Sequence, residues 1–363
     1  MLYKLDKYIL KQFSSIFLIA ILGFLSVFLI VDLIENLDRF VDNNVPTNIV
    51  INYYIYTIPW FISIGLPMAT LISTVFGIGV LVKRNEWTAM KSSGISLYRL
   101  SAPLLIIGLI LSFTSFVLDN QLVSWGNKKR YAIDRDYVKR SSRHKLKKTL
   151  KNIFIQKNKT IHISLEKYNL QKMSGNVLTW VDLGTSMIKQ RIDAKKLSYQ
   201  KDSLKWIIGN YSIRKFENGI ETEVLLSEKD TLIDLSFSPN DISSQARSPD
   251  ELDYYELTSR IDELKENGVK TIRWEVTRYM KISFSLTNFI LVLFGIPLVV
   301  FREKNSLSFG IGMSVFVIFA YYAFIKFGQS MGFKGQLSPL ISAWLGNVVF
   351  FIGGIILLIR ARK

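Results

Sequence analysis

Six long apolar stretches that contain no Asp, Glu, Lys or Arg constrain the fold of this chain more than any other feature. They run from Phe13 to Val31, Tyr53 to Val82, Leu100 to Leu118, Ile282 to Phe301, Leu307 to Ile325 and Leu337 to Ile359. A helix of about 20 residues crosses the hydrocarbon core of a bilayer. A charged side chain at its centre costs roughly 2.5–3.5 kcal/mol. The pattern therefore predicts six transmembrane helices, three on each side of a large polar insert.

The short segments that flank these stretches are basic on one side only. The basic flanks hold Lys4, Lys7, Lys11, Lys83, Arg84, Lys91, Arg99, Arg302, Lys304, Arg360, Arg362 and Lys363. Because Lys and Arg near the ends of spans are retained in the cytoplasm, we expect both termini to be cytoplasmic. With six crossings, residues 119–281 then lie outside, in the periplasm of a bacterium that has one.

The first apolar stretch is expected to remain as a helix. It is too long for the apolar region of a signal peptide, and no small-x-small cleavage site follows it. The chain has no cysteine. The outer domain is therefore expected to depend on side-chain burial and strand pairing, without disulfides.

The formal charge of +17 at first suggests a nucleic-acid partner. The expected position of most of this charge, outside the cytoplasm, argues against one. The densest basic run extends from Lys128 to Lys151 and contains only two acids, Asp134 and Asp136. Two interpretations stay open for this run: a solvated helix extension or linker, and a surface that attracts anionic lipid or glycolipid phosphate.

The polar insert has the pattern of β-strands. Runs rich in β-branched and aromatic residues are separated by turn formers and predict strands at 152–156, 160–165, 177–183, 190–199, 204–216 and 221–226. Short strands joined in this way favour a sandwich, a jelly roll or a curled open sheet. An open sheet would leave an edge for pairing with another chain.

The end of the insert predicts a short amphipathic helix. Ser248 and Glu251 have the spacing of a capping box, with Pro249 at the first helical position. Leu257, Ile261 and Leu264 follow at helical spacing. We expect this helix to lie along the membrane surface and to lead into the fourth span.

Motifs for catalysis or ion coupling are sparse. His144 and His162 have no plausible ligand cluster around them, and neither a phosphate-binding loop nor a nucleophile elbow occurs. Asp32, Asp119 and Lys326 lie near the outer ends of spans, where they can reach water, so a proton relay has little support. The sequence predicts neither an enzyme nor an ion-coupled transporter, and no metal or cofactor bound by this chain.

The loop between the second and third spans is the most specific segment. Residues 83–96 read KRNEWTAMKSSGIS, a short helix-capable stretch that ends at a glycine. Here the chain resembles the LptF/LptG family of lipopolysaccharide-export permeases, in which R-x-E followed by M-x-x-S-G forms the coupling helix that docks on an ATPase. The matching residues are Arg84, Glu86, Met90, Ser93 and Gly94. Weaker similarities are the LDKYI start at 5–9, GLP at 65–67, RIDA at 191–194 and GIPL at 295–298.

The resemblance covers essentially the whole chain and implies a fold and a set of partners. The fold is α-helical and membrane-embedded, with six transmembrane helices and an all-β, jellyroll-like periplasmic domain inserted between helices 3 and 4. The expected domains are 1–119, 120–278 and 279–363. The implied partners are a second LptF/LptG-like permease, a cytoplasmic LptB-like ATPase dimer that binds the ATP and magnesium, LptC-like and LptA-like jellyroll proteins, and lipopolysaccharide.

Within this scheme Glu86 is the expected contact to the ATPase, because a carboxylate that reaches a cationic groove makes a strong directional bond. For the phosphorylated head of the lipid the expected contacts are Arg39 and Lys334. The outer end of the first span also holds Asp32, Glu35 and Asp38, so Arg39 has an alternative role, a helical ion pair with Glu35.

Three alternatives stay open. The LDKY start favours the LptG branch over the LptF branch. A mechanotransmitting or lipoprotein-extracting transporter subunit also has a large outer domain, although such subunits usually have four spans. A membrane-bound enzyme acting on envelope lipid would need catalytic groups that the sequence does not offer.

Overall fold

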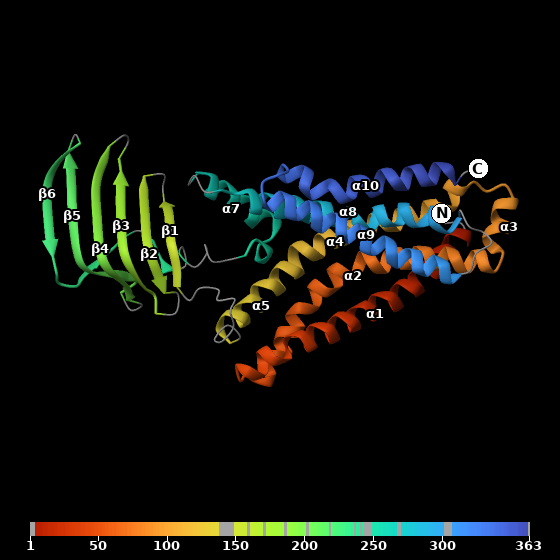
Figure 1. The fold of residues 1–363 in the computed structure, drawn as a ribbon, viewed down its shortest axis with the longest axis horizontal. Coiled ribbons are helices and arrows are strands. Elements are labelled where there is room, and N and C mark those ends of the chain that lie inside the picture. Colours follow the sequence, from red (N-terminus) through yellow and green to blue (C-terminus); the bar gives the residue numbers. More distant parts are fainter. Residues whose placement is uncertain are drawn as a thin grey trace. The chain divides into compact units, whose positions relative to one another are not determined.

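The computed structural model describes residues 4–137, 149–157, 160–169, 172–184, 187–200, 203–217, 219–235, 237–239, 242, 248–266, 270–300 and 307–361. The chain divides into two compact units. One unit combines Met1–Ser141 with Pro249–Lys363, and the other is Ser142–Ser248. The first unit is helical and the second contains all the strands (Figure 1).

Six helices of the described residues are long and apolar enough to cross a membrane, in agreement with the six predicted spans. They are α1 (Lys4–Asp42), α2 (Thr47–Lys83), α4 (Leu97–Leu118), α8 (Ile272–Val300), α9 (Leu307–Phe333) and α10 (Pro339–Arg360). After α4 the helix continues through a π-helical turn, η1 (Asp119–Val123), into α5 (Ser124–Asp136). The basic run therefore begins, at Lys128, within an extension of the third span, which agrees with the interpretation of this run as a helix extension.

Helix α8 lies at the centre of the bundle and contacts α2, α4, α9 and α10. Close approach depends on small residues, since a Cβ at Gly295 would meet Leu71 of α2 and one at Gly108 would crowd Val292. Buried polar side chains pair with each other: the Tyr321 hydroxyl donates to Thr287 at 2.8 Å and also contacts Asn347. Polar groups in hydrocarbon need such internal partners, so these bonds tie α8, α9 and α10 together.

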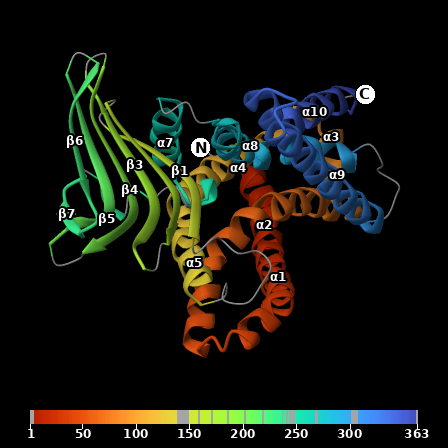
Figure 2. The same ribbon diagram turned by 60° about the vertical axis from the view of Figure 1, so that its left-hand side comes forward.

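The second unit is a seven-stranded antiparallel sheet. Its strands are β1 (Thr149–Lys157), β2 (Ile161–Asn169), β3 (Ser174–Leu183), β4 (Ile188–Gln200), β5 (Lys205–Glu217), β6 (Ile220–Ser227) and β7 (Thr231–Ile233). The order is β1-β2-β3-β4-β5-β6, and β7 pairs with β5 (Figure 2). All six predicted strands are present, and the short β7 is additional. From β1 to β6 each strand pairs with the next along the chain, so these described strands form an open antiparallel meander.

One face of the sheet carries the core of this unit. Trp180 and Trp206 are buried there, and their indole nitrogens donate to the backbone oxygens of Leu235 and Phe237, at 3.2 and 2.6 Å. The segment that follows β7 therefore covers the core face, with Leu235, Phe237 and Ile242 packed into the same cluster. In contrast, β6 is exposed on both faces and presents Val224, Leu225 and Leu226 to solvent.

A charged cluster joins the three central strands on the sheet. Asp193 of β4 accepts hydrogen bonds from Arg191 at 2.8 and 3.0 Å, from Arg214 of β5 at 3.1 Å and from Thr179 of β3 at 2.9 Å. Partial burial opposes ionisation of Asp193, but the hydrogen bonds from Arg191 and Thr179 and the nearby positive charges lower its pKa. The RIDA segment thus has a structural role in this sheet.

The lowered pKa of Asp193 predicts a pH dependence for the sheet. Because the folded state favours the carboxylate form, ionised Asp193 stabilises the fold fully above the pKa of about 3.9 that an aspartate has in an unfolded chain. This stabilisation is lost as the pH falls through the lower pKa that Asp193 has in the folded state. In Asp193→Asn we expect lower protection of the β3–β5 amides against hydrogen exchange at neutral pH, and a smaller further loss of protection on acidification than in the unchanged chain. Glu223→Gln is the control, since its pair with Lys215 is fully exposed and screened by water. Parallel acid profiles for Asp193→Asn and the unchanged chain would contradict this role.

The helix that follows the sheet begins later than the sequence pattern predicts. Pro249–Glu251 forms only a 3-10 turn, η3, and α7 spans Tyr254–Glu266. Its capping box is formed by Asp253 and Glu256: the Glu256 N–H donates to Asp253 at 2.8 Å, and the Asp253 N–H donates to Glu256 at 3.3 Å. The predicted start of the helix at Pro249 was therefore wrong, since α7 begins at Tyr254. Glu251 is buried and pairs with Arg135.

The predicted apolar face of this helix is confirmed. Leu257, Ile261 and Leu264 are all buried on α7.

Candidate functional site

The predicted coupling segment forms a short helix, α3 (Glu86–Ser92), between α2 and α4. Asn85 precedes it in the left-handed conformation, with a φ of 58°. Glu86 lies in the first turn and Lys91 in the last, the arrangement that the helix dipole favours. The helix is followed by Ser96, whose side chain caps the start of α4.

Trp87 anchors α3 to the helical bundle. Its side chain is 0% exposed and belongs to a cluster that includes Ile9 of α1, Leu97 of α4 and Leu358 of α10. Residues near both chain ends are therefore packed around α3 (Figure 1). The buried tryptophan therefore fixes α3 to the surrounding helices.

Three of the five predicted coupling residues have a clear structural task. Met90 packs against the Trp87 cluster. The Ser93 hydroxyl donates to the Met90 carbonyl at 2.8 Å, and the Gly94 N–H donates to Lys91 at 3.0 Å. Gly94 has a φ of 86°, which side chains other than that of glycine rarely adopt. These residues shape and end the helix.

The other two predicted coupling residues, Arg84 and Glu86, are charged. Arg84 is exposed in the turn before α3. Glu86 accepts a hydrogen bond from the Tyr8 hydroxyl at 2.8 Å, so its carboxylate already has one partner within the chain. The structure thus places Arg84 and Glu86 beside each other at the start of α3.

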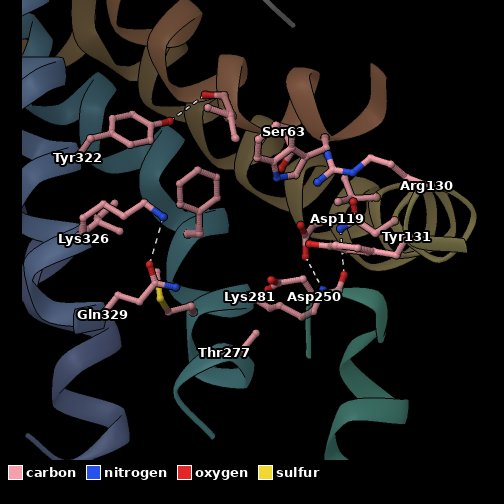
Figure 3. Close-up of a pocket in the computed structure, with 17 residues that line it drawn as sticks. Ser63, Asp119, Arg130, Tyr131, Asp250, Thr277, Lys281, Tyr322, Lys326 and Gln329 are labelled. Carbon is pink, nitrogen blue, oxygen red and sulfur yellow. Dashed lines mark hydrogen bonds and ion pairs between the residues drawn. The ribbon is translucent and has the colours of Figure 1, made fainter. Parts of the chain in front are cut away.

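A cavity of about 290 Å³ lies elsewhere in the helical unit, between α2, η1, α5, α8 and α9 (Figure 3). Its apolar lining includes Trp60, Ile64, Met280, Phe284 and Ile325. Three cationic side chains, Arg130, Lys281 and Lys326, also line it, together with the carboxylates Asp119 and Asp250. In Figure 3, Tyr322, Lys326 and Gln329 project from one helix and face Asp119 and Arg130 across the cavity.

The three cations differ in how they are held. Lys281 donates to Asp119 at 2.8 Å and to Ser124 at 3.3 Å, and its side chain is 8% exposed. Arg130 lies over the ring of Trp60 at 5.0 Å, and its buried Nε has no hydrogen-bond partner among the described residues. Lys326 is exposed and donates to Gln329 at 3.1 Å. Arg130 and Lys326 therefore retain hydrogen-bonding capacity for an anion.

Two local features bring these groups together. The π-helical turn at Asp119–Val123 adds a residue to the helical turn, and Asp119, Val123 and Asn127 all line the cavity. Gly126 then allows α5 to approach α2, since a Cβ there would collide with the Tyr56 carbonyl. This approach brings Arg130 over Trp60.

The arrangement suits an anionic amphiphile. Apolar side chains can accept hydrocarbon, while cations with hydrogen-bonding capacity can pair with phosphate or carboxylate oxygens. Among the described residues, no group of three or more His, Cys, Asp or Glu side chains could hold a metal ion.

The two predicted head-group residues lie outside this cavity. Arg39 contacts Asn36, and its guanidinium is 3.6 Å from Asp134 of α5. Asp134 therefore takes the place of Glu35, the pairing partner that helical spacing suggested. Lys334 is exposed in the turn after α9.

The described residues of the basic run that begins at Lys128 make different contacts. Lys128 pairs with Glu256 at 2.7 Å and Arg135 with Glu251 at 3.2 Å, whereas Arg130 lines the cavity. Residues 138–148 of the run lie outside the described residues. The sequence pattern does not single out Arg130 or Lys281, because their importance depends on contacts with α2, α8 and η1 that no local pattern encodes.

Comparison with known protein families gives one match over nearly the whole chain. The family model described as lipopolysaccharide export system permease LptF/LptG matches residues 7–360. A comparison with curated proteins found no match. The match extends over both the α3 segment and the cavity.

Proposed function

Because this chain belongs to the LptF/LptG family of lipopolysaccharide-export permeases, we propose that it is a non-catalytic subunit of an ATP-driven transporter. In this proposal a separate LptB-like ATPase dimer docks on α3, and a second LptF/LptG-like permease completes the membrane part. The substrate is lipopolysaccharide, extracted from the outer leaflet of the inner membrane. The LDKY start favours the LptG branch.

The separation of α3 from the cavity is the observation that carries the proposal. Ile64 lines the cavity and Lys83 ends the same helix, α2. Nineteen helical residues correspond to about 28 Å, close to the ~30 Å of a hydrocarbon core. The cavity and α3 thus have the spacing of two opposite membrane surfaces. This is what a permease needs if ATP is hydrolysed on one side and an amphiphile is collected on the other.

The cavity offers a site for the lipid head. Lys326 and Arg130 supply cations for phosphate, and the side chains of Phe284, Met280 and Ile325 supply apolar surface for the start of the acyl chains. Arg39 and Lys334 remain candidates for a second, outer contact with the saccharide phosphates. Their exposure is compatible with this role, and crosslinking to lipopolysaccharide from position 39 or 334 tests it.

The open sheet is proposed to receive the lipid and to join an LptC-like or LptA-like partner of similar fold. The edge strand β6 carries exposed apolar side chains, and among the described strands it pairs only with β5. An exposed edge of this kind is suited to adding a strand from another chain. The proposal places this sheet in the periplasm and both chain termini in the cytoplasm.

The absence of cysteine in the sequence permits a direct test of this orientation. Single cysteines introduced at Leu204, which is exposed before β5, and at Thr88, exposed on α3, provide the two probes. A membrane-impermeant maleimide should label Leu204→Cys in cells with a permeabilised outer membrane, and Thr88→Cys only after the inner membrane is opened. Labelling in the reverse order would contradict the proposed orientation.

Transport itself is tested by reconstitution. The chain is purified with its ATPase and second permease, placed in proteoliposomes with lipopolysaccharide, and supplied with ATP. We expect ATP-dependent transfer of lipopolysaccharide to a soluble jellyroll acceptor, and no transfer with a non-hydrolysable nucleotide. Release of a lipoprotein in place of lipopolysaccharide would favour the lipoprotein-extracting alternative.

A further inference from the structure

The first turns of α1 are attached to the α3 region by two polar contacts. The Tyr8 hydroxyl donates to Glu86 Oε2 at 2.8 Å. Two residues earlier, Asp6 accepts two hydrogen bonds from Arg99 at the start of α4, at 2.8 and 2.7 Å. Asp6 is only 5% exposed, so this ion pair fixes the backbone that carries Tyr8.

Apolar packing supports the same attachment. Ile9 and Phe13 are buried in the cluster that contains Trp87 and Leu97. In contrast, the most apolar window of α1 has no buried residue. The cytoplasmic end of α1 is therefore held firmly at α3, and the position of Tyr8 is set from both sides.

The bond from Tyr8 restricts the side chain of Glu86. A glutamate side chain has three rotatable bonds, and fixing it when a partner binds costs conformational entropy. A carboxylate also has two oxygens, so Oε2 can retain the tyrosine while Oε1 accepts a bond from a cation of a partner. Arg84 also lies near this hydroxyl, so both charged coupling residues flank Tyr8.

We propose that Tyr8 is a positioning residue for Glu86, which holds the carboxylate in the arrangement that docks on the ATPase. The inference rests on the proposed function, in which Glu86 is the docking carboxylate. Tyr8 lies on the first helix, whereas the residues predicted from the sequence to dock on the ATPase all lie in the loop between α2 and α4. Tyr8 acts through Glu86 and does not itself need to touch the ATPase.

A double-mutant cycle in the complete complex tests the inference. Tyr8→Phe and Glu86→Gln are made singly and together, and lipopolysaccharide-stimulated ATP hydrolysis and ATPase binding are measured. Loss of the Tyr8 hydroxyl should reduce both by about threefold to tenfold, the net effect of one typical hydrogen bond. In the Glu86→Gln background the same change should have little further effect, because the carboxylate is already gone. Tyr255→Phe, at an exposed tyrosine of α7, is the matched control and should leave both values unchanged.

The outcomes separate this inference from the proposed function. An equal loss from Tyr8→Phe in both backgrounds would show that Tyr8 acts independently of Glu86 and would overturn the inference. A full loss from Glu86→Gln with no loss from Tyr8→Phe would overturn it as well, while leaving the docking role of Glu86 intact. If Glu86→Gln has no effect, the docking assignment itself fails and the inference fails with it. Equal amounts of membrane-inserted protein in all variants establish that folding is not the cause.

Discussion

Replacing Glu86 with alanine is expected to uncouple the permease from its ATPase while leaving the protein inserted and folded. Removal of one partner from a hydrogen-bonded charge pair at an interface typically costs 2–5 kcal/mol. This corresponds to a loss of ATPase affinity of roughly thirtyfold to several thousandfold. We expect a matching fall in stimulated ATP hydrolysis and in lipopolysaccharide transfer by proteoliposomes.

The structure explains why this change should not unfold α3. Trp87 is fully buried in the cluster next to it, and Ser93 and Gly94 end the helix independently of Glu86. The neighbouring Thr88 is exposed on the same helix, so Thr88→Ala is a matched control that should retain coupling. Normal coupling in Glu86→Ala would remove the main support for α3 as the docking element.

The helices were predictable because the membrane imposes a simple requirement on sequence. A span must be long and free of central charges, and each of the six predicted stretches corresponds to an observed helix. Their ends were less predictable. Helix α1 extends from Lys4 to Asp42, beyond the apolar residues, because charged side chains at the ends of a span can reach water.

The strands of the sheet were predictable, but their arrangement was not. Alternating patterns identify β1 to β6, whereas the meander order depends on pairings that local pattern does not encode. The three-residue strand β7 is too short to give a pattern of its own. The start of α7 was misplaced because two segments, at Ser248 and at Asp253, have the residue types of a capping pair, and the α-helix begins after the second.

The candidate sites also differ in how far the sequence predicts them. The α3 segment is continuous in sequence, so a motif identifies it. The cavity combines α2, η1, α5, α8 and α9, which are distant in sequence. Arg39 attracted attention as the one base among acids at the end of the first span, but its partner is Asp134, almost a hundred residues away. Long-range pairing of this kind cannot be inferred from helical spacing.

The pair formed by Lys281 and Asp119 predicts a separation of stability from transport. Lys281→Met alone leaves Asp119 without its cation in a largely buried site, and breaking such a pair costs about 3–5 kcal/mol when it is fully buried. Since the Asp119 side chain is still 23% exposed, we expect the free energy of unfolding to fall by about 3 kcal/mol or less. This loss should be visible as a lower midpoint of thermal unfolding in detergent.

The double variant Asp119→Asn/Lys281→Met should recover most of this stability, because no unpaired charge remains. Transfer of lipopolysaccharide should stay reduced if the third N–H donor of Lys281, which neither Asp119 nor Ser124 accepts, binds the phosphorylated head. Lys326→Gln provides the complementary case: Lys326 is exposed, so its replacement should lower transfer with little change in the unfolding midpoint. Normal transfer by both variants would make the ion pair purely structural and would exclude Lys281 and Lys326 from lipid binding.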